Sequence, residues 1–515
     1  MGTTHSIRYD VLDSWRGIAA LFVALYHFRI HSNISTSSLI DGSYLFVDFF
    51  FALSGFVIAA NYKDRLSDTA SVRRFVVLRF GRLYPLHFFM LAAYVSLETF
   101  AVLIPAAGEL SHDGVFASER NSPFAIITNL LLIHSLGIHE SATWNLPSWT
   151  ISVEFYTYIV FAALICLVRR KFIIVTVCII TTSIILIVAV SDKMDVSYDY
   201  GIFRCLAGFF AGCICYEIFV RTRELVHARV GLIAGTMAEV FTILWIFGFI
   251  AVFAQARWSI AAPVLFGAAV FVFAFEKGLI SEVLKHRWFL SMGAMSYSIY
   301  MTHQFVQARI FNICDLLAGY SDNPIVASIR YRAGELSESE RIHGDIAYVP
   351  MLLAVVALSY LTYRFVEIPF RGRFRRLADR MDAGASRRLE WSGSGLAGPG
   401  PAIQAGQLWL APQGLAAATA SVEPIAASFT AGREAVDCKA DVAAPSHRSA
   451  SHAGATRRAC PPAATAASAP EVYLQEAYCD ASELLNPFTP RKGMGGVSRS
   501  MALHAKRCSQ EHEDD

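Results

Sequence analysis

The sequence predicts an all-α protein, a polytopic bundle of about ten membrane-spanning helices followed by a disordered C-terminal tail. The 515 residues are 55% hydrophobic and only 17% charged, with mean hydropathy +0.43. Soluble domains are nearer 45–50% apolar and about 25% charged. The formal net charge of +2 excludes a strongly basic nucleic-acid-binding protein, so no nucleic acid partner is expected.

Apolar runs long enough to consider as membrane helices, which need about 20 mostly apolar residues, recur along the first 370 residues. The run at 15–30 is long enough but carries polar groups, and the run at 123–137 is short. The candidate runs are 15–30, 44–61, 83–104, 123–137, 149–168, 172–190, 200–220, 230–253, 259–275, 289–312 and 347–366.

The distribution of Lys and Arg decides how many of these runs cross, because cytoplasmic loops carry the excess of positive charge. If 123–137 does not cross and the N-terminus is inside, the inner loops hold 21 Lys and Arg and the outer loops hold 6. If 123–137 does cross, the cluster Arg169-Arg170-Lys171 faces outward. We therefore predict ten spans, both termini cytoplasmic, and an outer re-entrant or interfacial segment at 123–137.

The composition divides the chain into two regions. Residues 1–380 form the predicted membrane domain, in what we expect to be a bacterial cytoplasmic (inner) membrane. Residues 381–515 are rich in Ala, Gly, Pro and Ser and lack a sustained apolar period, so we expect a disordered cytoplasmic tail of low complexity. None of the ten cysteines has metal-binding spacing, and no metal is expected.

Ionisable residues within apolar spans are costly, so they are candidate functional residues. Arg16 and His27 are eleven residues apart, which is three helical turns plus roughly 20°. Both therefore lie on one helix face, about 16 Å apart along the axis. Arg16 is expected near the cytoplasmic mouth and His27 deeper; the alternatives are a snorkelling arginine and a histidine bonded to a neighbouring helix.

Two further pairs of charged residues, one basic and one acidic, are candidate functional residues. Arg79 and Arg82 are three residues apart where a span begins, so with Arg16 they could form a cytoplasmic anion site, although ordinary positive-inside anchoring is the alternative. Asp48 and Glu154 lie near the outer ends of their spans, where Asp48 could also be an interfacial cap.

Other polar positions have structural explanations. The pair Ser54-Gly55 in an apolar run permits close helix packing. Glu367 is expected to pair locally with Arg364 or Arg371, and Pro369 is expected to end the last span.

The polar residues fall in blocks that resemble the acyltransferase 3 family of integral membrane O-acyltransferases. The blocks occur in the family's order and cover about residues 9–372. One match is approximate, because Ser152 stands one position later than the family's serine. The blocks are Leu12-Asp13-x-x-Arg16-Gly17 with His27, Val47-Asp48-x-Phe50-Phe51-x-Leu53-Ser54-Gly55-Phe56, Arg79-x-x-Arg82-Leu83-Tyr84-Pro85, Trp149-x-x-Ser152-Val153-Glu154, Ser296-Tyr297-Ser298-x-Tyr300-x-x-His303 and Glu367-x-Pro369.

The resemblance implies transfer of an acyl group, commonly acetyl, from a coenzyme A thioester to a sugar hydroxyl. The acceptor would be a cell-surface or exported glycan or a lipid-linked sugar, met in contact with membrane lipid. Acyl-CoA, with acetyl-CoA the expected donor, would bind Arg16, Arg79 and Arg82 through its phosphates. The implied catalytic residues are His27, Arg16, Asp48 and Glu154, and the implied acceptor-binding residues are Trp149, Tyr300 and His303.

Within this scheme His27 is either the general base for the acceptor hydroxyl or a transiently acylated nucleophile, and Asp48 or Glu154 would orient its ring. The competing class is a proton-coupled exporter of a lipid or sugar, which the buried histidines and carboxylates would suit, although no paired halves with broken helices are visible. The other large superfamily of membrane-bound O-acyltransferases also uses a buried histidine but lacks these blocks. The acceptor, the acyl chain and the oligomeric state stay open.

Overall fold

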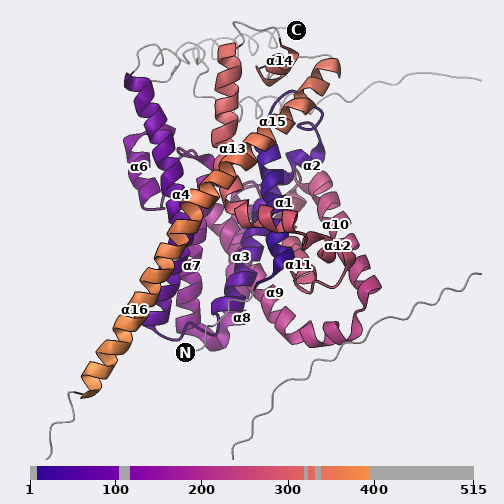
Figure 1. Cartoon of the computed structure of the whole chain (residues 1–515). Helices are drawn as coiled ribbons and strands as arrows, with labels where there is room; N and C mark the ends of the chain where they lie inside the picture. The colour runs from indigo at the N-terminus through magenta and orange to yellow at the C-terminus, as the bar shows by residue number, and fades with distance from the viewer. Residues whose placement is uncertain (1–7, 104–115, 117, 318–322, 331–337, 395–515) are drawn as a thin grey trace, which may run out of the picture. The chain divides into compact units, whose positions relative to one another are not determined.

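The computed structural model describes residues 8–103, 116, 118–317, 323–330 and 338–394, and within them every regular element is a helix (Figure 1). The predicted all-α class is therefore confirmed. A helix occupies each of the ten predicted spans. These helices are α1 (Asp10–His27), α3 (Phe46–Tyr62), α4 (Thr69–Leu103), α7 (Trp149–Val168), α8 (Phe172–Val190), α9 (Gly201–Arg229), α10 (Leu232–Phe253), α11 (Ala262–Ala274), α13 (Arg287–Leu317) and α15 (Glu338–Thr362).

Seven segments of the described chain are long and apolar enough by themselves to cross a membrane. One of them, Leu146–Val190, contains both α7 and α8, joined by the 3-10 turn η4 (Arg169–Lys171). The helices α1 and α13 fall outside this set although they have 18 and 31 residues, and both carry polar residues along their length. Those polar residues include four of the candidate site residues, Arg16 and His27 on α1 and Tyr300 and His303 on α13.

The segment predicted not to cross forms only a short helix. α6 (Pro123–Leu130) has eight residues, capped by Ser122, whose hydroxyl accepts from the Ala125 backbone N–H. About 20 residues are needed to span a bilayer, so α6 cannot cross one. It packs beside α4, where Leu91, Ala125 and Trp144 share a small apolar core (Figure 1).

The end of the bundle differs from the expectation for Pro369. α15 leads through one π-helical turn, η6 (Tyr363–Glu367), directly into α16 (Ile368–Ser394), so the chain continues as helix past the proline (Figure 1). The prediction that Pro369 ends the helix is wrong. The π-helical turn ends α15, and Pro369 is the second residue of α16, where proline is tolerated because the N–H groups in the first turn of a helix lack intrahelical partners. Most of the predicted tail, 395–515, lies outside the described residues, and 381–394 continue α16.

Glycines let two pairs of site-bearing helices approach closely. A Cβ added at Gly17 of α1 would lie 2.7 Å from the Gly293 backbone N of α13, and one at Gly293 would lie 2.2 Å from the Asp13 carbonyl. A Cβ at Gly55 of α3 would lie 1.7 Å from the Phe209 carbonyl of α9, which agrees with the packing predicted for Ser54-Gly55. Larger side chains would separate these backbones.

Candidate active site

A pocket of about 380 Å³ opens between α1, α3, α4, α7 and α13. Its charged lining consists of five arginines and two acids, so the pocket is electropositive. All three arginines predicted to form an anion site, Arg16, Arg79 and Arg82, line it. The charged lining residues are Arg8, Arg16, Arg65, Arg79, Arg82, Asp13 and Glu154.

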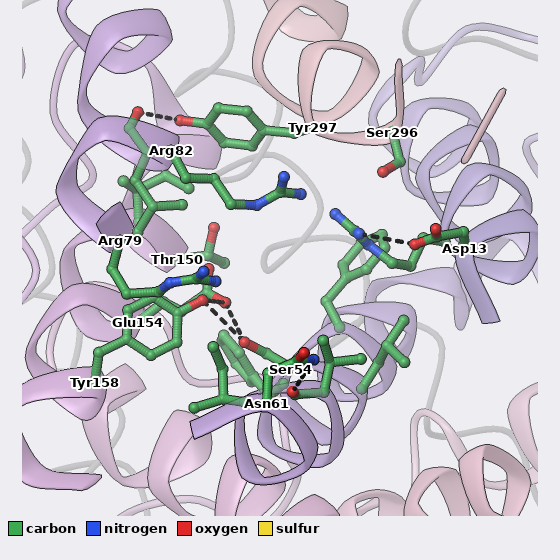
Figure 2. A pocket seen from close by; sticks show the side chains of 18 of the residues that line it. Asp13, Ser54, Asn61, Arg79, Arg82, Thr150, Glu154, Tyr158, Ser296 and Tyr297 are labelled. Carbon is green, nitrogen blue, oxygen red and sulfur yellow. Dashed lines mark hydrogen bonds and ion pairs between the residues drawn. The ribbon is translucent and has the colours of Figure 1, made fainter. Parts of the chain in front are cut away.

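Arg79 and Arg82 extend into the pocket from the same side of α4 (Figure 2). Arg79 Nη2 donates to the Tyr62 hydroxyl at 2.9 Å, and its guanidinium carbon lies 5.0 Å from the centroid of that ring. Among the described acids, none forms an ion pair with Arg79 or Arg82. Two partly buried guanidinium groups without a carboxylate partner among the described residues favour an anionic ligand, because charges withdrawn from water are normally paired.

Arg16 lies across the pocket from this pair, on the first half of α1. Its Nη1 is 3.4 Å from Asp13 Oδ1, a long contact with a carboxylate that also accepts from Arg8 Nε at 3.2 Å. Asp13 therefore shares its charge between two arginines, and the pocket keeps a positive balance.

Glu154 shares this pocket with the arginines, contrary to the expectation that it lies near the outer face. Its Oε1 accepts from the Ser54 hydroxyl at 2.6 Å and from the Tyr158 hydroxyl at 2.5 Å (Figure 2). The depth differs from the prediction because α7 does not begin at the surface. The chain before it folds into the bundle, where the Asn129 carbonyl reaches His87 of α4, five residues beyond Arg82.

His27, the last residue of α1, meets a second histidine from α13. His27 Nδ1 lies 2.9 Å from the Val23 carbonyl and 3.2 Å from His303 Nε2, while His303 Nδ1 lies 3.3 Å from the Ile299 carbonyl. The carbonyl partners place a proton on each Nδ1, so the tautomers follow from the hydrogen bonds. His303 Nε2 is then an acceptor facing His27 Nδ1–H, and His27 Nε2 carries a lone pair.

Tyr300 connects the pocket to the histidine pair. It lines the pocket, its ring packs on Phe50 with centroids 5.6 Å apart, and its centroid is 5.9 Å from that of His303. The arginine pocket therefore extends to within one side chain of the two imidazoles.

Asp48 does not contact His27. It is fully buried and pairs with Arg204 of α9, whose Nη2 donates to Asp48 Oδ2 at 2.7 Å and whose Nε lies 3.1 Å from Oδ1. The same guanidinium donates to the Tyr44 and Val196 carbonyls at 3.1 and 3.2 Å. The expectation that Asp48 or Glu154 orients His27 is wrong, because both carboxylates have other partners and His303 occupies that place.

Trp149 belongs to the same buried ion pair. Its ring centroid is 5.6 Å from the Arg204 guanidinium carbon and 5.9 Å from the Phe51 ring, and it is absent from the pocket lining. Trp149 therefore packs on a structural cation instead of lining the pocket. Arg204 escaped the sequence analysis, although an arginine within the apolar run 200–220 was a signal that could have identified it.

Glu367 pairs as predicted with Arg371, one turn later. Its second oxygen accepts from the Ser298 hydroxyl of α13 at 2.9 Å, so this acid joins the π-turn to α13. No group of three or more potential metal ligands occurs within the described part of the chain.

Comparison with known families agrees with this arrangement. The model of the acyltransferase 3 family, described as an acyltransferase domain, matches residues 9–364 and thus includes the histidine pair and every residue of the pocket except Arg8. The chain belongs to this family and is a multi-pass membrane O-acyltransferase.

Two relatives have recorded names. "Protein 2 in picA locus" of Rhizobium radiobacter is 32% identical over 161 residues, which is 30% of this chain and 81% of that protein. "Acyltransferase MdmB" of Streptomyces mycarofaciens is 34% identical over 176 residues, which is 32% of this chain and 41% of that protein. No solved structure shows a significant match.

Proposed function

We propose that the protein transfers an acetyl group from acetyl-CoA to a hydroxyl of a cell-surface or exported glycan. The observation that carries the proposal is the arrangement along α1. Arg16 near its start lies in the arginine pocket, and His27 at its end lies in the histidine pair. The two residues are about 16 Å apart along the helix, a distance suited to a donor with phosphates at one end and a thioester at the other.

The arginine pocket suits the charged part of this donor. Guanidinium groups bind phosphate oxygens through paired N–H donors, and Arg79 and Arg82 lack carboxylate partners among the described residues. The pocket volume of about 380 Å³ lies at the lower end of the usual range for ligand sites, roughly 300–1,000 Å³. We place the pantetheine arm past Tyr300 toward the histidines.

The tautomers suggest how His27 acts. Its Nε2 lone pair can take the proton of the acceptor hydroxyl as the oxygen attacks the thioester carbonyl. The carbon–sulfur bond then breaks, and the departing CoA thiolate takes that proton. His303 Nε2, 3.2 Å from His27 Nδ1, would accept from the imidazolium and hold it in place, the part earlier expected of a carboxylate.

The Lys and Arg bias between loops supports an orientation in which the arginine pocket opens to the cytoplasm of a bacterial inner membrane, with both termini inside. Cytoplasmic acetyl-CoA would then reach Arg79 and Arg82 directly. The acceptor would approach the histidines from the opposite face.

Transfer of labelled acetyl from acetyl-CoA by the purified protein in detergent tests this function. The acceptor is the surface glycan fraction from a strain lacking the gene, dosed as total hexose. We expect the wild-type protein to label the glycan and His27→Ala to lose at least about 100-fold in kcat, because general-base catalysis contributes about 10²–10⁴. Wild-type-like transfer by His27→Ala, or wild-type label that enters only lipid, would refute the proposal.

A further inference from the structure

A second group of buried polar side chains lies beside the histidine pair and takes no part in the scheme above. It consists of His87 on α4, His134 and Asn145 from the segment that precedes α7, and Gln304 on α13; we call it the amide–imidazole cluster. These side chains are 1%, 2%, 2% and 6% exposed, respectively.

Contacts between neighbouring elements bring the four residues together. The rings of His87 and His134 stack with centroids 5.5 Å apart and planes within 7°. Asn145 Nδ2 donates at 3.1 Å to the Met301 carbonyl of α13, one turn before Gln304. The Ser148 backbone joins the two pairs, because its N–H donates to the Asn145 carbonyl at 2.9 Å and its carbonyl lies 3.2 Å from His134 Nε2.

The packing of α4 against α13 sets the depth of the cluster. The Tyr297 hydroxyl donates to the Leu83 carbonyl at 2.5 Å, and further along both helices Phe305 packs on Tyr94 with centroids 5.3 Å apart. The two helices therefore run in the same direction, and His87 lies level with Met301. That level is within one helical turn of His303 on α13.

Each member of the cluster presents a polar atom that has no hydrogen-bond partner among the residues that the structure describes. These atoms are His87 Nδ1, His134 Nδ1, Asn145 Oδ1 and Gln304 Nε2. Buried polar groups in proteins are almost always paired, so four unpaired groups in one place indicate a missing partner.

The protonation of the imidazoles defines what that partner must offer. His87 Nε2 lies 3.0 Å from the Asn129 carbonyl, so His87 Nε2 donates and Nδ1 accepts. His134 Nε2 lies 3.2 Å from the Ser148 carbonyl, which accepts, and 3.1 Å from the Ser148 hydroxyl, which can donate, so this ring suits either tautomer. The cluster thus presents the acceptors His87 Nδ1 and Asn145 Oδ1 and the donor Gln304 Nε2, together with a His134 imidazole that can donate or accept, and none of these side chains is an acid, a lysine or an arginine.

We propose that the amide–imidazole cluster binds the hydroxyl groups of the acceptor and holds one of them beside His27. A mixture of neutral acceptors and donors suits an uncharged polyol, whose hydroxyls donate and accept, and suits neither an anion nor a cation. This inference rests on the proposed function. It gives the acceptor a site that includes neither Asp48, which pairs with Arg204, nor Trp149, which packs on the same guanidinium.

A matched pair of substitutions at His87 separates binding from structure. His87→Gln keeps a donor near the Nε2 position for the Asn129 carbonyl but removes the Nδ1 acceptor. His87→Asn keeps an acceptor near the Nδ1 position but loses the bond to Asn129. His139→Gln is the control, because His139 lies in the same segment, its Nε2 meets the Thr128 hydroxyl at 2.8 Å, and it has no unpartnered buried atom.

The measurement is the apparent KM for the glycan fraction, dosed as hexose, and for acetyl-CoA, with labelled acetyl-CoA and purified protein. We expect His87→Gln and Gln304→Leu to raise the KM for glycan about three- to tenfold, with a smaller rise for His87→Asn than for His87→Gln. The KM for acetyl-CoA should stay within twofold in every variant, and the control His139→Gln should keep both KM values within twofold. The kcat of each variant is calculated per folded molecule, with the folded fraction measured by size-exclusion chromatography.

The outcomes are distinguishable. Glycan KM values that stay at the wild-type value in His87→Gln and Gln304→Leu, while the wild-type enzyme labels glycan, would overturn this inference and leave the proposed function standing. Impairment of His87→Asn alone would also overturn it, because only a structural role for the Asn129 bond predicts that pattern. Failure of the wild-type enzyme to label glycan would refute both.

Discussion

The pair formed by Asp48 and Arg204 yields the sharpest prediction, because sequence and structure assign Asp48 different parts. The sequence favoured a carboxylate that orients His27, whereas the structure buries it against a guanidinium. We expect Asp48→Leu to lower the free energy of unfolding by about 3–5 kcal/mol, since it leaves a buried cation unpaired. Arg204→Met should cost at least as much, because it also frees the Tyr44 and Val196 carbonyls.

The double variant Asp48→Leu with Arg204→Met distinguishes the two parts. Removing both charges also removes the unpaired ion, so the double variant should be more stable than the sum of the single effects predicts, with a coupling energy of about 3 kcal/mol or more. The assay is reversible unfolding in mixed micelles titrated with SDS, followed by tryptophan fluorescence, with acetyl transfer measured per folded molecule.

Two results would refute this reasoning. If the single effects add within about 0.5 kcal/mol, Asp48 and Arg204 do not act as a pair. If the folded double variant loses more than about 100-fold in kcat, Asp48 takes part in the chemistry, as its sequence block suggested.

Three further predictions follow from the site. Replacing Arg79 and Arg82 together with Gln should raise the KM for acetyl-CoA about 100-fold, at roughly 1.5 kcal/mol for each charge-assisted bond, and a change in the KM for glycan alone would contradict their assignment. Gly17→Ala should destabilise the protein by about 1–3 kcal/mol and lower acetyl transfer, because its added Cβ meets the backbone of α13. The control Gly248→Ala, whose added Cβ has no atom within 4 Å, should change neither. If both variants shift the thermal unfolding midpoint equally, the packing of α1 on α13 is loose. His303→Phe should lower kcat by about 100-fold and leave both KM values within twofold, and an unchanged kcat would remove His303 from the proposed mechanism.

The sequence predicted the helices and brought Arg16, Arg79 and Arg82 forward as candidates for one anion site, which the pocket contains. Hydropathy and loop charge predicted the ten helices, because a bilayer accepts few other backbone structures. The spacing of Arg16 and His27 predicted that both lie on α1, because a helix fixes the separation of its own residues.

Only the tertiary structure decided the partners. The position of Asp48 along its predicted span suggested a depth close to that of His27. In the structure α3 packs against α9, and Asp48 pairs with Arg204 of α9 instead. Glu154 was misplaced for a related reason, since the chain before α7 enters the bundle and carries that residue into the arginine pocket.

The same distinction explains why the amide–imidazole cluster went unnoticed. His87, His134, Asn145 and Gln304 come from three separate parts of the chain, and nothing in their spacing connects them. Periodicity reports contacts within one helix, whereas their convergence depends on how α4, α13 and the segment before α7 pack. The sequence therefore determined the helices and the charge asymmetry, and the packing between helices decided which polar groups are paired with one another within the described residues.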